Sequence, residues 1–289
     1  MIAGDEQSFE ELVGARSFEP LGVAHSVHRE HDVLLHRFAA GHLVRGGQIE
    51  AVRHWHLVRS AAAHGGIAAD LPDQLRWLRF QLGDGRGTDS EGHETRVLRP
   101  ETLRSMQTRQ VDGGNNCEAV GYAWILEHPD VTKVWRHDSE TNGHMAGFTF
   151  VPDHDVGITV LTNSSSGIRP YEELIGWVLD EHRGLRAPPP PSTPTPELAP
   201  ITGRYSGARR DVVLSARDGE LWVGLQIHPR EGRPRPLVTP ATRARFTSES
   251  TFVTEGPLIG EGNLLGAVGR EPGPRQHWEG RLLERAADR

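Results

Sequence analysis

The sequence predicts an α+β protein in two parts: helices with an antiparallel sheet, then a small antiparallel β-barrel. Three observations lead to this prediction. Apolar residues follow helical spacing before residue 110 and strand spacing from 119 to 163, and a proline-rich run then precedes a second series of short strand patterns. That run, "APPPPSTPTPELAP", indicates a stiff, solvated linker at 187–200. We therefore expect one domain at 1–186 and another at 201–289.

Three helices are predicted ahead of the sheet. Ser8 and Glu11 form a capping box at the start of a helix over residues 8–18. Residues 70–83, "DLPDQLRWLRFQLG", have an aspartate that can cap, a proline in the first turn, a stripe of leucines and a terminal glycine. A shorter helix is expected over 100–109, where proline comes first. The histidine-rich stretch between the first two helices has no regular period, which predicts loops.

Four strand-like segments follow, "AVGYAWIL", "TKVWRH", "GFTFVP" and "VGITVLTN", with polar or turn residues between them. This pattern is typical of an antiparallel sheet. Residues 170–183 return to helical spacing and are expected to pack on that sheet. After the linker, "DVVLSARDGELWVGLQ" predicts a hairpin around Asp218-Gly219, and the remaining patterns complete a small β module.

Composition excludes several classes of function. A net charge of -7 with no basic run leaves no surface for a polyanion, so nucleic acid is not an expected partner. No run of about 18 apolar residues could span a bilayer, and the first residues have neither the basic nor the apolar part of a signal peptide. The protein is therefore expected in the cytoplasm if Met1 is the true start, and its localisation is otherwise open. Cys117, the only cysteine, is interpreted as an ordinary buried or surface thiol.

Sixteen histidines raise the question of a metal site, above all His25, His28 and His31, or His54 and His56. Metal ligands converge with fixed support from neighbouring groups, and these histidines lie in a stretch with no helical stripe and no clustered cysteine. Surface or loop histidines are the better interpretation, so no metal and no cofactor is predicted.

Five segments over residues 7–183 match, in order, the motifs of one known family: "SFEELVGARSFEPLGVAHS", "AHGGIAADLPDQLRWLRFQL", "VLRPETLRSMQT", "VGYAWIL" and "WRH...GFTFVPDHDVGITVLTN". They are similar to its "PLGM" segment, its "D-L-x-R-W" helix, the helix that follows, its "GLGW" strand and the region of its third catalytic motif. On these motifs the chain resembles the serine β-lactamase-like hydrolases, the group of class C β-lactamases, D-alanyl-D-alanine peptidases and related esterases. The resemblance implies the C-terminal part of that hydrolase domain.

The C-terminal segment "ITGRYSG...DGELWV" resembles the small lipocalin-like β-barrel domain often appended to such hydrolases. We expect this module to stabilise the protein or border the substrate, and not to hold a ligand of its own.

The resemblance implies a chemistry whose main groups this sequence lacks. In the family a Ser-x-x-Lys on a helix supplies the nucleophile and its base, and a Tyr-x-Asn supplies a phenolic base and an amide. Lys133 is the only lysine and has Asp130 three residues before it, so Ser-x-x-Lys is absent. None of the three tyrosines begins a Tyr-x-Asn.

His137 and Ser139 are the candidate site residues. They fall where the family carries His-x-Gly on a strand that borders the site, with serine in place of glycine. The resemblance implies that His137 orients the substrate or its leaving group and that a backbone N–H next to Ser139 is an oxyanion donor, if a partner supplies the nucleophile. As a self-contained pair the two residues lack an oriented third group, so independent Ser-His catalysis is not expected.

Three hypotheses for function remain open. The first is a β-lactamase-related serine hydrolase, for β-lactam, D-amino peptide or ester substrates, that is inactive alone because the gene is truncated or a partner polypeptide carries the N-terminal half of the domain. Missing parts of the sheet would then leave an unpaired strand edge and uncovered apolar surface. The second is a non-enzymatic peptide- or glycan-binding protein. The third, an active hydrolase with unrecognised residues, predicts loss of ester turnover in His137→Ala.

Overall fold

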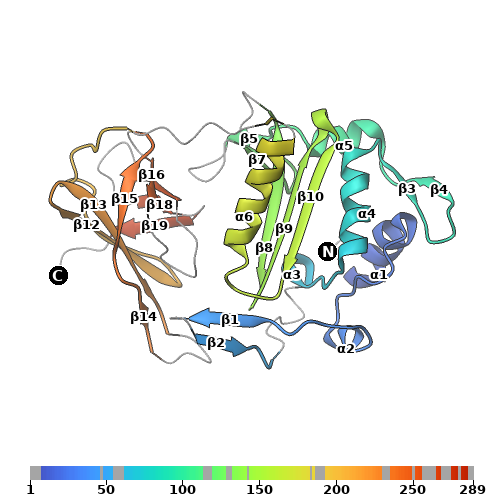
Figure 1. Ribbon diagram of the computed structural model, residues 1–289, viewed down its shortest axis with the longest axis horizontal. Coiled ribbons are helices and arrows are strands. Elements are labelled where there is room, and N and C mark those ends of the chain that lie inside the picture. Colours follow the sequence, from blue (N-terminus) through green and yellow to red (C-terminus); the bar gives the residue numbers. More distant parts are fainter. Residues whose placement is uncertain are drawn as a thin grey trace. The chain divides into compact units, whose positions relative to one another are not determined.

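A computed structural model shows an α+β chain with helices and antiparallel sheets, as predicted (Figure 1). The chain divides into two compact units, residues 1–111 with 119–185 and residues 112–118 with 186–289. The structure describes residues 8–45, 48–54, 62–112, 119–127, 132–141, 143–182, 184–185, 193–229, 235–248, 251–255, 265–267, 275–278 and 281–285.

The helices of the first unit form where the sequence supplies caps and apolar stripes, and all four predicted helices are confirmed. Asp70 caps α4 by accepting a hydrogen bond from the Asp73 backbone N–H at 3.0 Å. None of the described helices is long and apolar enough to cross a membrane. The helices are α1 (Phe9–Val13), continued by the π-helix η1 (Gly14–Phe18) and the 3-10 turn η2 (Glu19–Leu21), α2 (Glu30–Val33), α3 (Ala62–Gly65), α4 (Leu71–Leu82), α5 (Pro100–Met106), the 3-10 turn η4 (Pro152–His154) and α6 (Ile168–Trp177), continued by the π-helix η5 (Val178–His182).

A six-stranded antiparallel sheet is the core of the first unit, in the order β10-β9-β8-β7-β6-β5. β8 and β9 pair from Trp135 to Thr141, with His137 opposite Phe148 and Ser139 opposite Ala146. Among the described strands β10 pairs only with β9 and forms one edge of the sheet. The strands are β5 (Val111–Asp112), β6 (Ala119–Val120), β7 (Ile125–Glu127), β8 (Val134–Thr141), β9 (His144–Val151) and β10 (Val156–Thr162).

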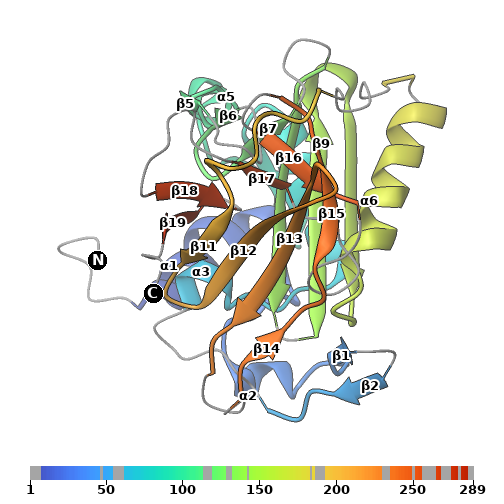
Figure 2. The ribbon, with the colours of Figure 1, turned by 90° about the vertical axis from the view of Figure 1, so that its left-hand side faces the viewer.

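Alternating side chains of this sheet build two separate apolar clusters. On one face Trp135, Phe148 and Phe150 pack with Leu78 of α4. On the other face, aliphatic side chains of β8, β9 and β10 pack with those of α6 and η5. Figures 1 and 2 show α6 lying along one side of the sheet. Each large apolar side chain buried in this way stabilises the fold by about 1.5–3 kcal/mol. The two clusters therefore fix which way each side chain of β8 points.

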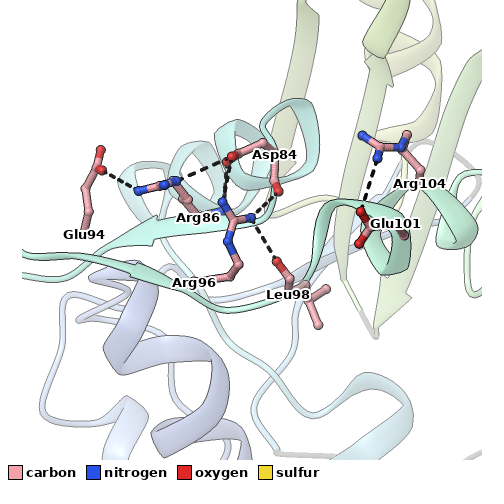
Figure 3. A network of polar contacts seen from close by, with 7 residues as sticks. All are labelled: Asp84, Arg86, Glu94, Arg96, Leu98, Glu101 and Arg104. Carbon is pink, nitrogen blue, oxygen red and sulfur yellow. Dashed lines mark hydrogen bonds and ion pairs between the residues drawn. The ribbon is translucent and has the colours of Figure 1, made fainter.

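Two short hairpins occur where the sequence predicted no strands, and the second is held by charges (Figure 3). Arg96 contacts the Asp84 carboxylate at 3.0 Å, and Arg86 contacts Glu94 at 3.3 Å. The Arg96 hydrogen bond lowers the pKa of Asp84. Apolar alternation, on which strand prediction depends, is absent from such polar segments. The hairpins are β1 (His42–Arg45) with β2 (Gln48–Ala51), and β3 (Arg86–Thr88) with β4 (Glu94–Arg96).

The second unit is an antiparallel sheet around one apolar core that includes Tyr205, Phe246 and Phe252. The predicted hairpin is confirmed as β12 and β13, with Asp218 and Gly219 in the turn at φ 52° and 78°. Because β12 pairs with both β11 and β13, the pairing runs from β11 through the other strands to β19 and returns to β11. The strands are β11 (Gly203–Ser206), β12 (Arg210–Arg217), β13 (Glu220–Ile227), β14 (Leu237–Val238), β15 (Thr242–Phe246), β16 (Thr251–Thr254), β17 (Leu265–Ala267), β18 (Arg275–Trp278) and β19 (Arg281–Arg285).

Candidate functional site

Strand β8 presents both predicted site residues on one face of the sheet. His137 and Ser139 are two positions apart, so their side chains point the same way, and both are exposed. They share this face with Trp135, which belongs to the cluster packed on α4. Asp138, between them, points to the opposite face. The structure thus brings the predicted pair to the α4 side of β8 and places a carboxylate on the α6 side.

The edge of β8 beside the candidate serine has no strand next to it in the part of the chain that the structure describes. β7 pairs with β8 only from Val134 to Arg136. The turn Gly121–Trp124 connects β6 to β7, so β7 begins only after Trp124. Residues 137–141 of β8 therefore extend beyond the end of β7.

One hydrogen bond gives the direction of the peptide groups along this edge. The Gly121 N–H donates to the Trp124 carbonyl at 2.8 Å, so Trp124 faces β6. Peptide groups alternate along a strand, so the next residue of β7 faces β8, and its partner Arg136 faces β7. Asp138 and Glu140, two and four positions after Arg136, have their peptide groups on the same side of β8 as Arg136. The N–H groups on either side of the candidate serine, those of Asp138 and Glu140, therefore point to the edge.

Aromatic rings lie beside His137. Its imidazole is edge-on to the indole of Trp124, with ring centroids 6.5 Å apart. Trp124 is buried, stacks with Phe148 at 5.5 Å and meets Phe150 edge to face at 4.8 Å. Rigid contacts on one side limit the positions open to the imidazole, while its remaining surface is exposed. His137 is therefore held by aromatic rings on one side and exposed on the other.

A polar network anchors β8 on its α6 face. The Tyr171 hydroxyl of α6 donates to Asp138 Oδ1 at 2.6 Å and lies 3.0 Å from Thr149 Oγ1. Arg136 forms ion pairs with Asp138 at 3.2 Å and with Glu127 at 3.1 Å. Charge-assisted hydrogen bonds of this kind are stronger than neutral ones. Contacts on the α6 face therefore hold the segment of β8 that carries His137 and Ser139.

Burial and charge shift pKa values within this network. Burial, followed by the Asp138 carboxylate, raises the pKa of the Tyr171 hydroxyl far above its usual value, which keeps it a donor. Burial also raises the pKa of Glu172, with Arg136 opposing the rise and Asp138 adding to it. Although burial disfavours the charged guanidinium, the carboxylates of Glu127 and Asp138 raise the pKa of Arg136.

The turn that precedes β7 has a strained residue, Ala123, at φ 66° in the left-handed region. The matching position of the "GLGW" motif is glycine, which adopts such a φ without strain. A Cβ added at Gly121 would lie 2.3 Å from the Met106 carbonyl oxygen, so the first glycine of the turn is required by packing. Tyr122, at the tip, is exposed. Backbone strain is thus present in the turn that precedes β7, next to the edge of β8.

The histidines considered as metal ligands do not converge. Within the described residues, one group of three possible ligands lies within 4.8 Å, formed by His25, Asp70 and Asp73. Asp70 accepts from His25 Nδ1 at 2.7 Å and caps α4, while Asp73 accepts from the His25 backbone N–H at 2.8 Å. Both carboxylates are therefore engaged in attaching the loop to the helix. Of the other candidates, His28 stacks with Phe18, His31 and His54 are exposed, and His56 and Cys117 lie outside the described residues.

Comparison with known proteins decides the family. The family model described as Beta-lactamase matches residues 2–183, more than half of the chain. The chain belongs to the β-lactamase family. The matched region contains the whole six-stranded sheet, including β8 and both candidate residues.

The proteins that this chain is similar to are longer than the chain itself. Penicillin-binding protein 4 of Amycolatopsis lactamdurans is 30% identical over 210 residues, which are 69% of this chain and 54% of that protein. The crystal structure of SurE matches 97% of this chain and 64% of its own at a TM-score of 0.64 and 19% identity. The octameric penicillin-binding protein homologue from Pyrococcus abyssi matches 97% and 59% at a TM-score of 0.54 and 18% identity. The chain thus spans less than two thirds of these relatives, and the structural likeness shows a shared fold.

Sequence reasoning identified β8 but missed the polar groups behind it. Asp138 and Tyr171 are 33 positions apart, and the apolar pattern assigned the tyrosine only to a helix that packs on the sheet. A signal was available, because a buried tyrosine hydroxyl needs a polar partner and strand alternation turns Asp138 toward the face that this helix covers.

Proposed function

We propose that this chain forms the strand side of a β-lactamase-related serine hydrolase site and does not become acylated on its own. One observation carries the proposal: β8 has exposed His137 and Ser139 beside an edge with which no described strand pairs, while the sequence has no Ser-x-x-Lys and no Tyr-x-Asn. A serine hydroxyl needs a base within hydrogen-bond reach to attack a carbonyl. The Cα atoms of His137 and Ser139 are about 6.6 Å apart along one strand, because each residue of a strand adds about 3.3 Å. This spacing does not by itself bring the imidazole within hydrogen-bond reach of the hydroxyl.

In the proposed site His137 orients the substrate or its leaving group. A backbone N–H next to Ser139 acts as an oxyanion donor, which is supported by the direction of the Asp138 and Glu140 peptide groups. The nucleophile and its base come from a polypeptide that carries the Ser-x-x-Lys and Tyr-x-Asn motifs. The reaction class is acyl transfer from a β-lactam, a D-amino peptide or a carboxylic ester.

For the rest of the chain we propose a hydrolase part at 1–186, a proline-rich linker at 187–200 and a small lipocalin-like β-barrel at 201–289. Support for a barrel is the pairing sequence: apart from β14, which pairs only with β13, there are eight described strands, and each of them pairs with two others of the eight. Its interior is filled by apolar side chains. This packing favours a stabilising module over one that holds a ligand.

The test compares the chain alone with the chain mixed with a polypeptide that carries the missing motifs. Incubated with a labelled penicillin or an activated ester, the chain alone is expected to give no covalent adduct. The mixture is expected to give an adduct on the partner's serine that is reduced in His137→Ala. Covalent labelling of the isolated chain would contradict the proposal. Saturable non-covalent binding of peptide or glycan, with no adduct in either sample, would favour a non-enzymatic binding protein.

A further inference from the structure

We infer that the outer edge of β10 pairs with the same edge of a second copy of this chain, so that two six-stranded sheets join across a twofold axis. The two strands run antiparallel, and the axis passes beside Thr159. The pairing goes beyond the proposed function and is independent of it, because the edge at β10 is not the site on β8.

β10 has the composition of a strand from the middle of a sheet. Its sequence, "VGITVLT", contains no charged residue and no proline, the residues by which natural edge strands usually avoid pairing with another chain. Continuous apolar runs of this kind are typical of strands covered on both faces. Among the described strands, however, β10 pairs only with β9. The composition of β10 therefore favours a second neighbouring strand.

Helices cover both faces of β10 without taking up its edge (Figure 1). On one face Val156 and Ile158 pack with Leu179 of η5. On the other face, a Cβ added at Gly157 would lie 2.5 Å from the Leu78 side chain of α4. Because side chains stand perpendicular to a sheet while its hydrogen bonds run between strands, these contacts leave the hydrogen-bonding groups of the edge available.

The direction of the peptide groups on β10 follows from that on β8, because these groups alternate along paired strands. The groups of Asp138 point to the edge of β8, so those of His137 and its partner Phe148 face each other. The next residue of β9, Thr149, therefore faces β10 and its partner Ile158. The residues of β10 on either side of Ile158 thus direct their N–H and C=O groups away from β9.

One antiparallel register pairs the whole of β10 with its copy. The residues that face the outer edge are Gly157, Thr159 and Leu161, and Thr159 is the midpoint of the seven-residue strand. A twofold axis beside Thr159 pairs it with its own copy and pairs Gly157 with Leu161 of the second copy, which gives about six hydrogen bonds. Past the strand, the Asn163 carbonyl accepts from the His42 N–H at 2.9 Å, so the available edge ends with β10.

The side chains that face each other in this register are compatible. Ile158 lies opposite Val160 of the second copy, and both belong to the apolar cluster packed on α6 and η5. On the α4 face Leu161, which is 38% exposed, lies opposite Gly157, which has no side chain. No charge on β10 opposes the pairing. Because the same edge of both copies is used, the assembly closes as a dimer.

The first measurement is sedimentation of the full chain over a range of concentrations. A monomer–dimer equilibrium is expected, with no species larger than the dimer. A chain that stays monomeric at every concentration, or that forms an open series of larger species, would overturn the inference.

A backbone variant tests the edge itself. Proline has no N–H, and the Thr159 N–H faces away from β9, so Thr159→Pro removes the central hydrogen bonds between copies and leaves the β9 pairing intact. Its dimer dissociation constant is expected to rise at least about tenfold. Thr159→Val is the matched control, because it keeps the N–H and the Thr159 hydroxyl makes no hydrogen bond in the described chain. A folded Thr159→Pro that dimerises like Thr159→Val would contradict the inference.

Spin labels test the register without altering β10, and they decide the question if Thr159→Pro does not fold. Labels are attached to His154→Cys, an exposed position before the strand, in a Cys117→Ser background. The register places the two copies of the neighbouring Asp155 about 26 Å apart, because each residue of a strand adds about 3.3 Å. A distance of roughly 20–35 Å between labels is expected. A shorter distance, as in parallel in-register pairing, or no defined distance in the dimer would overturn the inference.

Discussion

Tyr171 joins helix α6 to strand β8 through one buried hydroxyl, which contacts Asp138 at 2.6 Å and Thr149 at 3.0 Å. Tyr171→Phe removes that hydroxyl and leaves both groups without this partner. Because a lost partner exposes the full desolvation cost of a buried polar group, we expect the free energy of unfolding to fall by about 1–3 kcal/mol. Urea denaturation measures the change. Tyr122→Phe, at an exposed turn, is the control and should change stability by less than about 0.5 kcal/mol; equal losses would contradict the role of the network.

Glu172 makes the stability of this face depend on pH. Burial raises its pKa in the folded protein, with Arg136 opposing and Asp138 adding to the rise. The folded state therefore holds the proton more tightly than the unfolded state, so ionisation of Glu172 costs stability as the pH rises from about 4.3 through the raised pKa. We expect Glu172→Gln to be more stable than the parent at pH 7, by less than about 1 kcal/mol because the side chain is partly exposed, and equal to it at pH 4. A difference that is constant between pH 4 and pH 7 would contradict this assignment.

Single residues differ in how far the sequence predicts them. His137 and Ser139 could be placed on one face of a strand, because strand alternation is a local property of the chain. The contact of Asp138 with Tyr171 had only an indirect signal, the need of a buried hydroxyl for a polar partner, because Tyr171 reaches Asp138 only when α6 packs on the sheet. The roles assigned to the candidate pair stay predictions.

At the scale of elements, the turn between β6 and β7 stores strain at Ala123, which has φ 66°. A left-handed φ costs a residue with a Cβ about 1–2 kcal/mol, and glycine avoids most of that cost. Part of this gain is lost, because glycine has more conformational freedom in the unfolded chain. We expect Ala123→Gly to raise the free energy of unfolding by about 0.5–1 kcal/mol in thermal or urea denaturation. Gly121→Ala, in the same turn, should be destabilising because its Cβ would lie 2.3 Å from the Met106 carbonyl oxygen. Destabilisation by Ala123→Gly would show that the turn is not strained.

Helices and strands in which apolar residues recur at regular spacing could be predicted from the sequence, and short polar hairpins could not. α4 has a capping aspartate, an early proline and a terminal glycine, and the structure confirms it at Leu71–Leu82. The hairpin of β3 and β4 depends instead on a charge network around Asp84, for which no periodicity gives a signal (Figure 3). β2, Gln48–Ala51, is exposed along its length, so its sequence lacks the alternation of apolar and polar residues by which a half-buried strand is recognised.

At the scale of the whole molecule, the order of motifs predicted the family before any contact was known. The match to residues 2–183 confirms that prediction, because five weak segments in the right order are together specific. The second unit was predicted from hairpin patterns, and its core is confirmed as an antiparallel sheet. The pairing between β11 and β19 joins strands that are far apart in sequence and leave no local signal, and a β-barrel at 201–289 stays a prediction.

The surface of the first unit has features that favour association. Leu34, Leu35 and Ile49 are 77%, 82% and 71% exposed. β10, Val156–Thr162, has neither charged residue nor proline, and among the described strands it pairs along one edge only. Natural edge strands usually carry such residues because an unpaired edge can add a strand from another chain. These features lead to a prediction about the isolated protein.

We expect the isolated chain to bind a dye for exposed apolar surface and to sediment as larger species when its concentration rises. Leu161→Lys puts a charge on β10 and should shift the distribution toward monomer, because a charged edge strand pairs poorly with another chain. Leu174→Lys on α6 is the matched control, since the two leucines are 38% and 40% exposed. Equal effects of both variants would assign association to apolar surface in general and not to the edge. A monomeric, cooperative melt of the parent chain without dye binding would contradict the prediction altogether.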